Sequence, residues 1–475
     1  MMVLQSIVFP NNYCTTKELY FNCDKAVPQI NEGITIPGGS RISFYSYMNN
    51  FDGGTWKRYA VFLKVKLDLE IKGKGIIIVK NILGNKTTII EKQPFDISSF
   101  DSLQIDIKYG QYDGQFYFEV ETDSEVYLRK ASFVTDDKPC NDVKIALNIC
   151  TYHRKEYVLR NLEQLKSSVF FATGNDLNGK LSITIVDNGS ELECIDQENI
   201  RLVHNPNTGG AGGFSRGLKE ICYNDVSATH VVFMDDDVNF ITESLYRMYA
   251  LLAYMNSEYR SNPVAGRMFR MDKPWIQYTA AEVWNGGDLK HIGWNADMTI
   301  PSNINDMNDN CSAEYGGWWF CCFPMAFASV NEPLPFFIHC DDVEYGLRYG
   351  EAPIILNGIQ VWHETYEYRQ SPVIAYYDTR NSLIVNSMYG LAPKEEMLGR
   401  WREHVGMAYA ENDHTKERMI ILGMLDFLKG KEYILKLDAE KNHNKLCRIK
   451  VRSKFVNRLL WRYAKMKYVK VKDRI

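Results

Sequence analysis

The segment from Val231 to Asp237 constrains the fold more than any other part of the chain, because four apolar residues run directly into three aspartates. A short apolar run of this kind is typical of a strand buried on both faces inside a parallel sheet. Open sheets of that class bind ligands at the carboxyl ends of their strands. Three crowded carboxylates raise one another's pKa, and a divalent cation that takes carboxylate oxygens relieves the conflict. The alternative is a solvated acidic loop, but the buried strand before the aspartates favours the metal site.

The length of 475 residues predicts two or three domains. A hydrophobic content of 45% and a charged content of 24% indicate a globular protein, and the net charge of −4 gives no reason to expect nucleic-acid binding. The eleven cysteines form no Cys-x-x-Cys pair, which is typical of reduced cytosolic cysteine and not of disulfides or a zinc site. We expect no signal peptide, and no segment approaches the roughly 20 apolar residues that span a bilayer.

Residues 1–138 alternate polar and apolar side chains in short segments such as Gln115–Val120. Turn pairs such as Gly38-Gly39 and Asp113-Gly114 separate these segments, so we predict an N-terminal antiparallel β-sandwich. Its aromatic residues are expected to fill the core, although a sugar-stacking surface is the alternative. The polar segment Thr135–Pro139 is interpreted as a linker.

Residues 139–392 alternate strand and helix patterns, which predicts an α/β domain with a mainly parallel sheet and helices on both faces. Thr242 is expected to cap one of the helices. Residues 393–475 are predicted to form a helical, basic region. The expected strands are 143–149, 182–186, 201–204 and 354–361 beside the aspartate strand, and the expected helices are 155–170, 213–223, 243–258, 343–348 and 394–437.

Polar residues follow the first two strands of the α/β region. Thr151 and Arg154 follow the first strand, and Asp187 closes the second. In a doubly wound sheet such neighbouring ends flank a nucleotide site, where a carboxylate can accept from uracil or ribose and Arg154 can meet a diphosphate. The alternative for Asp187 is an ordinary Asp-Asn-Gly-Ser turn.

The run Asn207–Arg216 contains four glycines in five positions, which allows close approach of the backbone to a ligand. Its spacing and place differ from the dinucleotide fingerprint, and it lacks the Gly-Lys of a P-loop. The alternative is a flexible turn. A second glycine pair precedes Trp318 and Trp319, which either line a sugar-binding cleft or belong to the core. Both can be buried on a strand only if both its faces are covered.

A second acidic pair, Asp341-Asp342, lies at the start of a predicted helix, where the helix dipole alone would stabilise it. The functional interpretation is a general base that accepts a proton from a hydroxyl nucleophile. His363 follows a later strand and is either a packed histidine or a metal ligand brought back to the aspartate cluster.

In this order the motifs resemble those of inverting family 2 glycosyltransferases of the GT-A fold, and more closely the galactofuranosyltransferases that build cell-wall galactan from UDP-galactofuranose. The resemblance covers residues 143–390, and it also implies an N-terminal β-sandwich and a C-terminal helical region. The motifs that carry it are Thr-Tyr-His-Arg, Val-Asp-Asn-Gly, Asn-x-Gly-Gly-x-Gly-Gly-Phe, Asp-Asp-Asp, Gly-Gly-Trp-Trp, Asp-Asp-x-Glu-Tyr-Gly, Trp-His and Tyr-Asp-Thr-Arg-Asn-Ser.

The resemblance implies a role for each matched residue. Mn²⁺ or Mg²⁺ would be held by Asp235, Asp237 and His363, and Asp342 would be the base, with Asp341 binding sugar hydroxyls. The donor-binding set is Thr151, Arg154, Asp187, Asn207, Gly210 and Asp236, and the acceptor-binding set is Trp318, Trp319, Glu282 and Tyr366. Cys340 stands where the galactan polymerases have an aromatic residue, and Tyr366 stands where they have Trp.

The implied function is metal-dependent, inverting transfer of galactofuranose from UDP-galactofuranose to a glycan or lipid-linked glycan. The alternatives are another donor, such as UDP-galactopyranose or dTDP-rhamnose, and a non-catalytic glycan-binding protein. Basic residues mix with aromatic ones near the C-terminus, which suits an anionic membrane surface at the inner face of the cell membrane. A solvated terminal helix is the alternative there. Assembly into a homo-oligomer is a further expectation.

Overall fold

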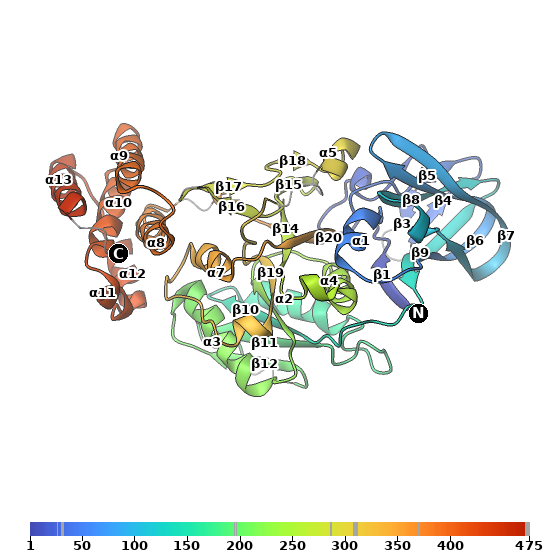
Figure 1. Cartoon of the computed structure of the whole chain (residues 1–475), viewed down its shortest axis with the longest axis horizontal. Coiled ribbons are helices and arrows are strands. Elements are labelled where there is room, and N and C mark those ends of the chain that lie inside the picture. Colours follow the sequence, from blue (N-terminus) through green and yellow to red (C-terminus); the bar gives the residue numbers. More distant parts are fainter. Residues whose placement is uncertain are drawn as a thin grey trace.

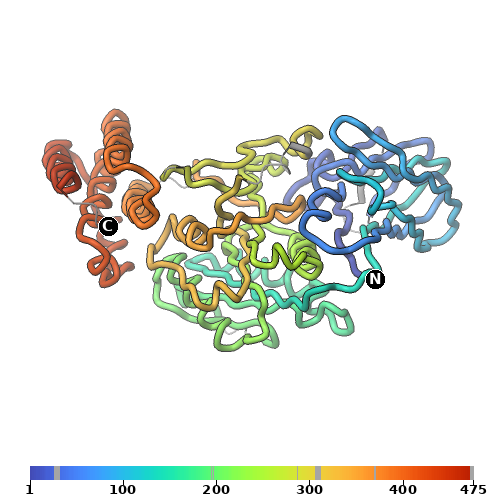
Figure 2. The backbone as a smooth tube through the Cα atoms, viewed as in Figure 1, coloured from blue at the N-terminus to red at the C-terminus, as the bar shows by residue number. Residues whose placement is uncertain are grey.

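The computed structural model of the chain describes residues 1–25, 27–29, 33–193, 195, 197–285, 287–306, 312–368 and 371–470. Three regions follow one another along the long axis: N-terminal strands, a central α/β region and C-terminal helices (Figure 1). The backbone trace shows the first strands and the last helices at opposite ends of the molecule (Figure 2).

The N-terminal region is a nine-stranded antiparallel sheet, as the alternating pattern predicted. Its longest strands are β6 (Lys66–Leu83) and β7 (Lys86–Asp106), which pair along most of their length. Residues 66–72 of β6 also pair with β9, and residues 75–82 pair with β8, so β6 joins the two halves of the sheet. The other elements are β1 (Met2–Ser6), β2 (Asn22–Cys23), β3 (Val27–Gln29), β4 (Gly33–Ile36), β5 (Arg41–Ser43), α1 (Gly53–Tyr59), β8 (Gln115–Thr122) and β9 (Val126–Thr135).

The central sheet is mixed and has the strand order β12-β11-β10-β13-β19-β14-β15-β18, with β20 paired to β14. The first four strands are parallel, as predicted, whereas β19 runs antiparallel between β13 and β14. These strands are β10 (Ile145–Thr151), β11 (Leu181–Asp187), β12 (Ile200–His204), β13 (His230–Asp235), β14 (Val264–Arg270), β15 (Ile276–Thr279), β18 (Ala296–Asp297), β19 (Phe320–Pro324) and β20 (Ile354–His363); β16 (Glu282–Trp284) and β17 (Leu289–His291) form a separate hairpin.

Burial on both faces explains the apolar run of β13. Val231 and Phe233 pack in one hydrophobic cluster, while Val232 and Met234 pack in another. Successive side chains of a strand point to opposite faces, so each face of β13 is covered by its own layer.

The helices of the central region lie close to where periodicity placed them. They are α2 (Lys155–Lys166), α3 (Gly209–Asn224), α4 (Thr242–Tyr254), α5 (Pro301–Asp306), α6 (Met325–Ala328), α7 (Asp341–Tyr349) and α8 (Ile374–Tyr389). Several predicted bounds were wrong: α3 begins at Gly209 and not at Gly213, α2 ends at Lys166 and not at Phe170, and α4 ends at Tyr254 and not at Glu258. The predicted cap was also wrong, because Thr242 is the first helical residue and Ile241 holds the cap position.

The C-terminal region contains α9 (Lys394–Ala410), α10 (His414–Phe427), α11 (Lys431–Leu435), α12 (Ala439–Cys447) and α13 (Lys454–Lys470). Where 394–437 was expected as one helical stretch, the structure divides it among α9, α10 and α11. Among the described residues, every helix is too short or too polar to cross a bilayer.

The N-terminal region is joined to the central sheet by buried hydrogen bonds. The Arg247 guanidinium donates to the carbonyls of Ser6 (3.0 Å) and Met48 (2.8 Å), and it pairs with Glu243 at 2.9 Å. On β20, the backbone N–H of Gly358 donates to the Tyr47 hydroxyl at 3.2 Å. The N-terminal region is therefore fixed to the same strand that ends at His363.

Candidate active site

The carboxyl ends of the parallel strands bring several predicted residues to one edge of the sheet. In the strand register, Asp235 on β13 lies beside Cys150 on β10, and Thr151 on β10 lies beside Asp187 on β11. Parallel strands place their carboxyl ends at the same edge, where open α/β sheets bind ligands. The register therefore gathers the ends of three strands into one site.

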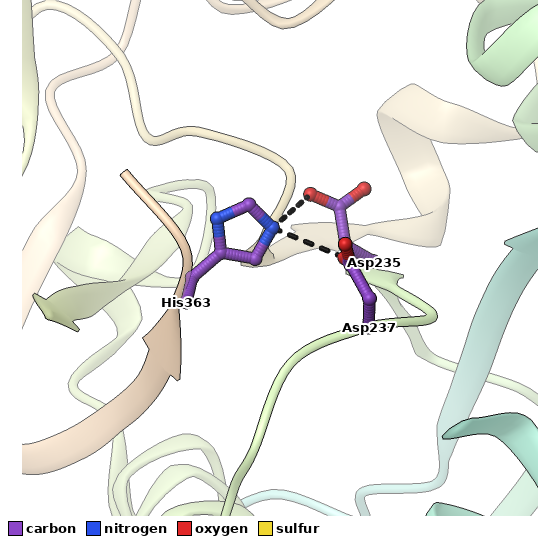
Figure 3. Close-up of side chains that lie close together, drawn as sticks. All are labelled: Asp235, Asp237 and His363. Atoms are coloured by element: carbon purple, nitrogen blue, oxygen red, sulfur yellow. Dashed lines mark hydrogen bonds and ion pairs between the residues drawn. The ribbon is translucent and has the colours of Figure 1, made fainter. Parts of the chain in front are cut away.

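Asp235, Asp237 and His363 converge at this edge (Figure 3). The His363 Nε2 atom lies 3.5 Å from an Asp235 oxygen and 3.1 Å from an Asp237 oxygen. One ligand atom from each residue lies within 4.8 Å of the other two, and the Asp235 side chain is 37% exposed while the other two are buried. The cluster is open to solvent on the side of Asp235. Two carboxylates and an imidazole in this arrangement suit a divalent cation that also binds a ligand not supplied by the protein.

Arg154 joins the neighbouring aspartates from the start of α2. Its guanidinium lies 2.9 Å from an oxygen of Asp236 and 2.9 Å from an oxygen of Asp237. The Thr151 hydroxyl donates to the second Asp236 oxygen at 2.7 Å. Burial raises the pKa of Asp236, and the Arg154 charge opposes that shift. Asp236 thus points into the protein and anchors Arg154 beside the cluster.

Asp187 is buried at the end of β11 and accepts hydrogen bonds from its own loop. The donors are the backbone N–H groups of Gly189 (2.9 Å), Glu191 (2.7 Å) and Leu192 (2.8 Å). These bonds agree with the alternative interpretation of Asp-Asn-Gly-Ser as an ordinary turn, because the Asp187 carboxylate holds the loop that follows the strand.

The glycine run forms the first turn of α3. Asn207 accepts from the Gly209 N–H at 3.1 Å at the start of the helix. A Cβ atom at Gly213 or Gly217 would overlap side chains of β10, whereas one at Gly210 would meet nothing within 4 Å. Gly213 and Gly217 therefore allow close packing of the helix on the sheet, whereas Gly210 borders open space.

The acid pair Asp341-Asp342 forms the first turn of α7, and both residues are partly exposed. Burial raises the pKa of Asp341 to about 6. Burial, together with the charges of Asp341 and Glu282, raises the pKa of Asp342 well above its usual value. A carboxyl group with a raised pKa at the rim of a site is suited to take up a proton.

The two adjacent tryptophans lie in the core, and neither indole lines an open path. Trp318 packs against Phe214 and Phe233 on one side of the sheet. Trp319 belongs to the hydrophobic cluster on the other side, and its indole N–H donates to the Gly266 carbonyl at 2.8 Å. The prediction that they bind the acceptor is not supported by these positions, because both faces of the sheet are covered there.

The other two residues of the acceptor set lie near the acid pair. Glu282 is buried and pairs with His291 at 2.9 Å, close enough for its charge to raise the pKa of Asp342. Tyr366 is 41% exposed, and its ring centroid lies 6.0 Å from that of His339. Sequence reasoning missed His339, although Asp378, which holds its ring, belongs to one of the recognised motifs.

Comparison with known proteins gives two family matches. Galactofuranosyltransferase 2 N-terminal matches residues 4–136, and Glycosyl transferase family 2 matches residues 147–301. The galactofuranosyltransferase GlfT2 of Mycobacterium tuberculosis is 24% identical over 458 residues, which are 88% of this chain and 69% of that protein. GlfT2 of Mycolicibacterium smegmatis is 24% identical over 453 residues, which are 88% and 68% of the two chains. These matches confirm the resemblance drawn from the motifs.

Among solved structures, the mannosyltransferase PcManGT from Pyrobaculum calidifontis, in complex with GDP-Man and Mn²⁺, is similar with a TM-score of 0.33 and 13% identity. The similarity covers 70% of this chain and 89% of that chain, and it is too distant to bear on function.

Proposed function

We propose that this chain, a family 2 glycosyltransferase, transfers galactofuranose from UDP-galactofuranose to a glycan or lipid-linked glycan acceptor in cell-surface polysaccharide synthesis. The enzyme class rests on the family match at residues 147–301 and on the two similar galactofuranosyltransferases. The donor sugar is inferred from the names of those relatives and from the match of the N-terminal region.

The observation that carries the proposal is the convergence of Asp235, Asp237 and His363 at the carboxyl edge of the sheet. We infer that these three residues hold Mn²⁺ or Mg²⁺, which when bound supplies a Lewis acid for the negative charge of a nucleotide diphosphate. Arg154, fixed by Asp236, adds a second positive charge at the same edge. Thr151, Asp187, Asn207 and Gly210 complete the proposed donor side.

Asp342 is the proposed base. Its carboxylate accepts the proton of an acceptor hydroxyl, whose oxygen forms a bond to the anomeric carbon as the bond from that carbon to the phosphate oxygen breaks. The electron pair of the broken bond leaves with UDP. A single displacement inverts the configuration, so an α-linked donor gives a β-linked product. Asp341, next to the proposed base, is proposed to bind sugar hydroxyls, and Glu282 and Tyr366 are proposed to bind the acceptor.

Helix α13 supports the proposal that the enzyme works at the inner face of the cell membrane. One face of the helix packs against α10 through Ala464 and Tyr468, which are buried. The opposite face carries four exposed apolar residues at intervals of three or four: Phe455, Leu459, Tyr463 and Met466. Arg458, Arg462 and Lys465 flank this stripe. An exposed apolar stripe beside basic residues suits an anionic membrane surface.

A donor panel tests the function. The chain is incubated with UDP-galactofuranose, UDP-galactopyranose or dTDP-rhamnose, an alkyl galactofuranosyl disaccharide and Mn²⁺, and nucleotide release and product linkage are measured. We expect release and a new β-galactofuranosyl bond only with the first donor, and both should be lost on chelation of the metal and in Asp342→Asn. Turnover of another donor would overturn the proposed sugar, and release that withstands chelation would overturn the metal site.

A further inference from the structure

The turn before α7 has an unusual backbone. Phe337, His339 and Cys340 have φ angles of 74°, 65° and 63°, in the left-handed region that favours glycine. Non-glycine residues persist in this region only where the surrounding structure holds them, and such residues cluster at functional sites. The acid pair Asp341-Asp342 follows directly, so the turn fixes the direction from which the proposed base enters the site.

Two helices, α8 and α3, hold this turn. On α8, the Asn381 side-chain amide donates to the carbonyls of Ile338 (2.9 Å) and His339 (2.8 Å). Arg380 donates to the Phe336 carbonyl at 2.7 Å, and both α8 residues are buried. On α3, the Ala211 N–H donates to the Phe337 carbonyl at 3.3 Å. The arginine and asparagine of the recognised Tyr-Asp-Thr-Arg-Asn-Ser motif therefore support the backbone of the turn.

Helix α8 also holds the side chain of His339. The His339 Nδ1 atom lies 2.6 Å from a carboxylate oxygen of Asp378, one turn before Asn381 on α8. The ring contacts that of Tyr366 at a centroid distance of 6.0 Å, and the side chain is partly exposed. Backbone and side chain of His339 are thus both fixed by α8, with the imidazole at the edge of the site.

The charges around His339 favour its protonated form. Burial alone would lower the pKa of His339, but the carboxylates of Asp378, Asp341 and Asp342 raise it above its usual value. In return, the charge of His339 lowers the pKa of Asp341 and Asp342 against the opposing effect of burial.

Other charged or titratable groups lie around the turn and the acid pair. Glu282 on β16 raises the pKa of Asp342, while Tyr366 lies against the His339 ring. Arg380 on α8 donates to the Phe336 carbonyl, and His443 on α12 contacts the Phe337 ring at 5.0 Å. Burial lowers the pKa of His443, which favours its neutral form.

We propose that His339 is a positioning residue for the proposed base: held by Asp378, its imidazolium stands beside the acid pair and keeps Asp342 in the ionised form that accepts the acceptor's proton. The inference rests on the proposed function, since it assumes that Asp342 is the base. Two carboxylates side by side repel each other, and a cation fixed next to them favours ionisation of both.

The variant His339→Asn tests the inference. Asparagine tolerates a left-handed backbone, and its amide can donate to Asp378, but it carries no charge. We expect the acid limb of the pH profile of kcat/KM for UDP-galactofuranose and the alkyl disaccharide acceptor to move upward. A move of about one pH unit lowers kcat/KM about tenfold at a fixed pH on that limb. At higher pH the rate should approach that of the parent, and Mn²⁺-dependent UDP binding should be unchanged.

Three further variants make the result decisive. His443→Asn removes a histidine that contacts the ring of Phe337 in the same turn, and it should leave the pH profile unchanged. Asp378→Asn should move the acid limb in the same direction as His339→Asn. If Asp342→Asn is inactive but the His339 and Asp378 variants keep the parental acid limb, or lose activity equally at all pH values, the inference is overturned and the proposed base stands. If Asp342→Asn keeps near-parental transfer, the base assignment itself is wrong.

Discussion

Removal of the His363 imidazole is the sharpest test of the proposed metal site. The imidazole is one of three ligands that the structure brings within 4.8 Å of one another. Loss of groups that merely orient metal ligands typically weakens affinity 10–100-fold, so loss of a ligand should cost at least about 100-fold. At a Mn²⁺ concentration of about 1,000 Kd, binding stabilises the folded state by about 4.1 kcal/mol, and a 100-fold weaker site leaves about 1.4 kcal/mol.

The difference of about 2.7 kcal/mol corresponds to a loss of roughly 5–10 °C in the metal-dependent rise of Tm for a unit the size of the central region. Thermal unfolding of the parent and of His363→Ala, each with Mn²⁺ and with a chelator, measures this metal-dependent rise of Tm. Calorimetric titration gives the Kd for Mn²⁺ directly. His204→Ala is the matched control, because His204 is an exposed histidine at the end of β12, which β11 and β10 separate from β13. If His363→Ala keeps the full metal-dependent rise, the histidine is not a ligand.

Three further outcomes are expected. Trp318→Ala should lower the free energy of unfolding by about 3–5 kcal/mol, because it opens a cavity in the core. Denaturant titration measures this loss. A selective rise in the acceptor KM without destabilisation would contradict the core position of Trp318. The pKa of Asp341 in the folded state is about 6, above its value in the unfolded state, so ionisation of Asp341 destabilises the fold as the pH rises through about 6. Asp341→Asn should therefore raise Tm at pH 7.5 but not at pH 3.5. An equal gain in Tm at both pH values would contradict this raised pKa. Leu459→Ser should weaken binding to phosphatidylglycerol vesicles severalfold, while activity on a water-soluble acceptor is unchanged; equal vesicle binding would argue against the membrane face.

Much of the central fold could be predicted because its signals are local. The apolar run of β13 must be covered on both faces, and helical spacing marks α2 and α4. The aspartate cluster and His363 follow strand ends, and strand ends are where such sheets place ligands. These features depend on residues that are close in sequence or on a general rule of sheet topology.

The remaining features depend on contacts between distant residues. The antiparallel direction of β19 is set by its pairing with β13, and the local sequence pattern of β19 does not indicate that direction. The glycines of α3 look like a loop in sequence, yet Gly213 and Gly217 are needed because the helix packs closely on β10. The left-handed backbone at His339 is held by Asn381 from 42 residues away, and no glycine marks the turn.

The attachment of the N-terminal region to β20 has a consequence for how this enzyme can be divided. Tyr47 bonds β20 at Gly358, and the Tyr13 ring lies 6.0 Å from that of Trp362, the immediate neighbour of His363. A fragment that begins after the linker would expose Trp362 and the buried Glu243–Arg247 pair to water. The first 135 residues are therefore part of the scaffold that sets the position of His363, and their removal is expected to disturb the proposed cation site as well as the packing around β20.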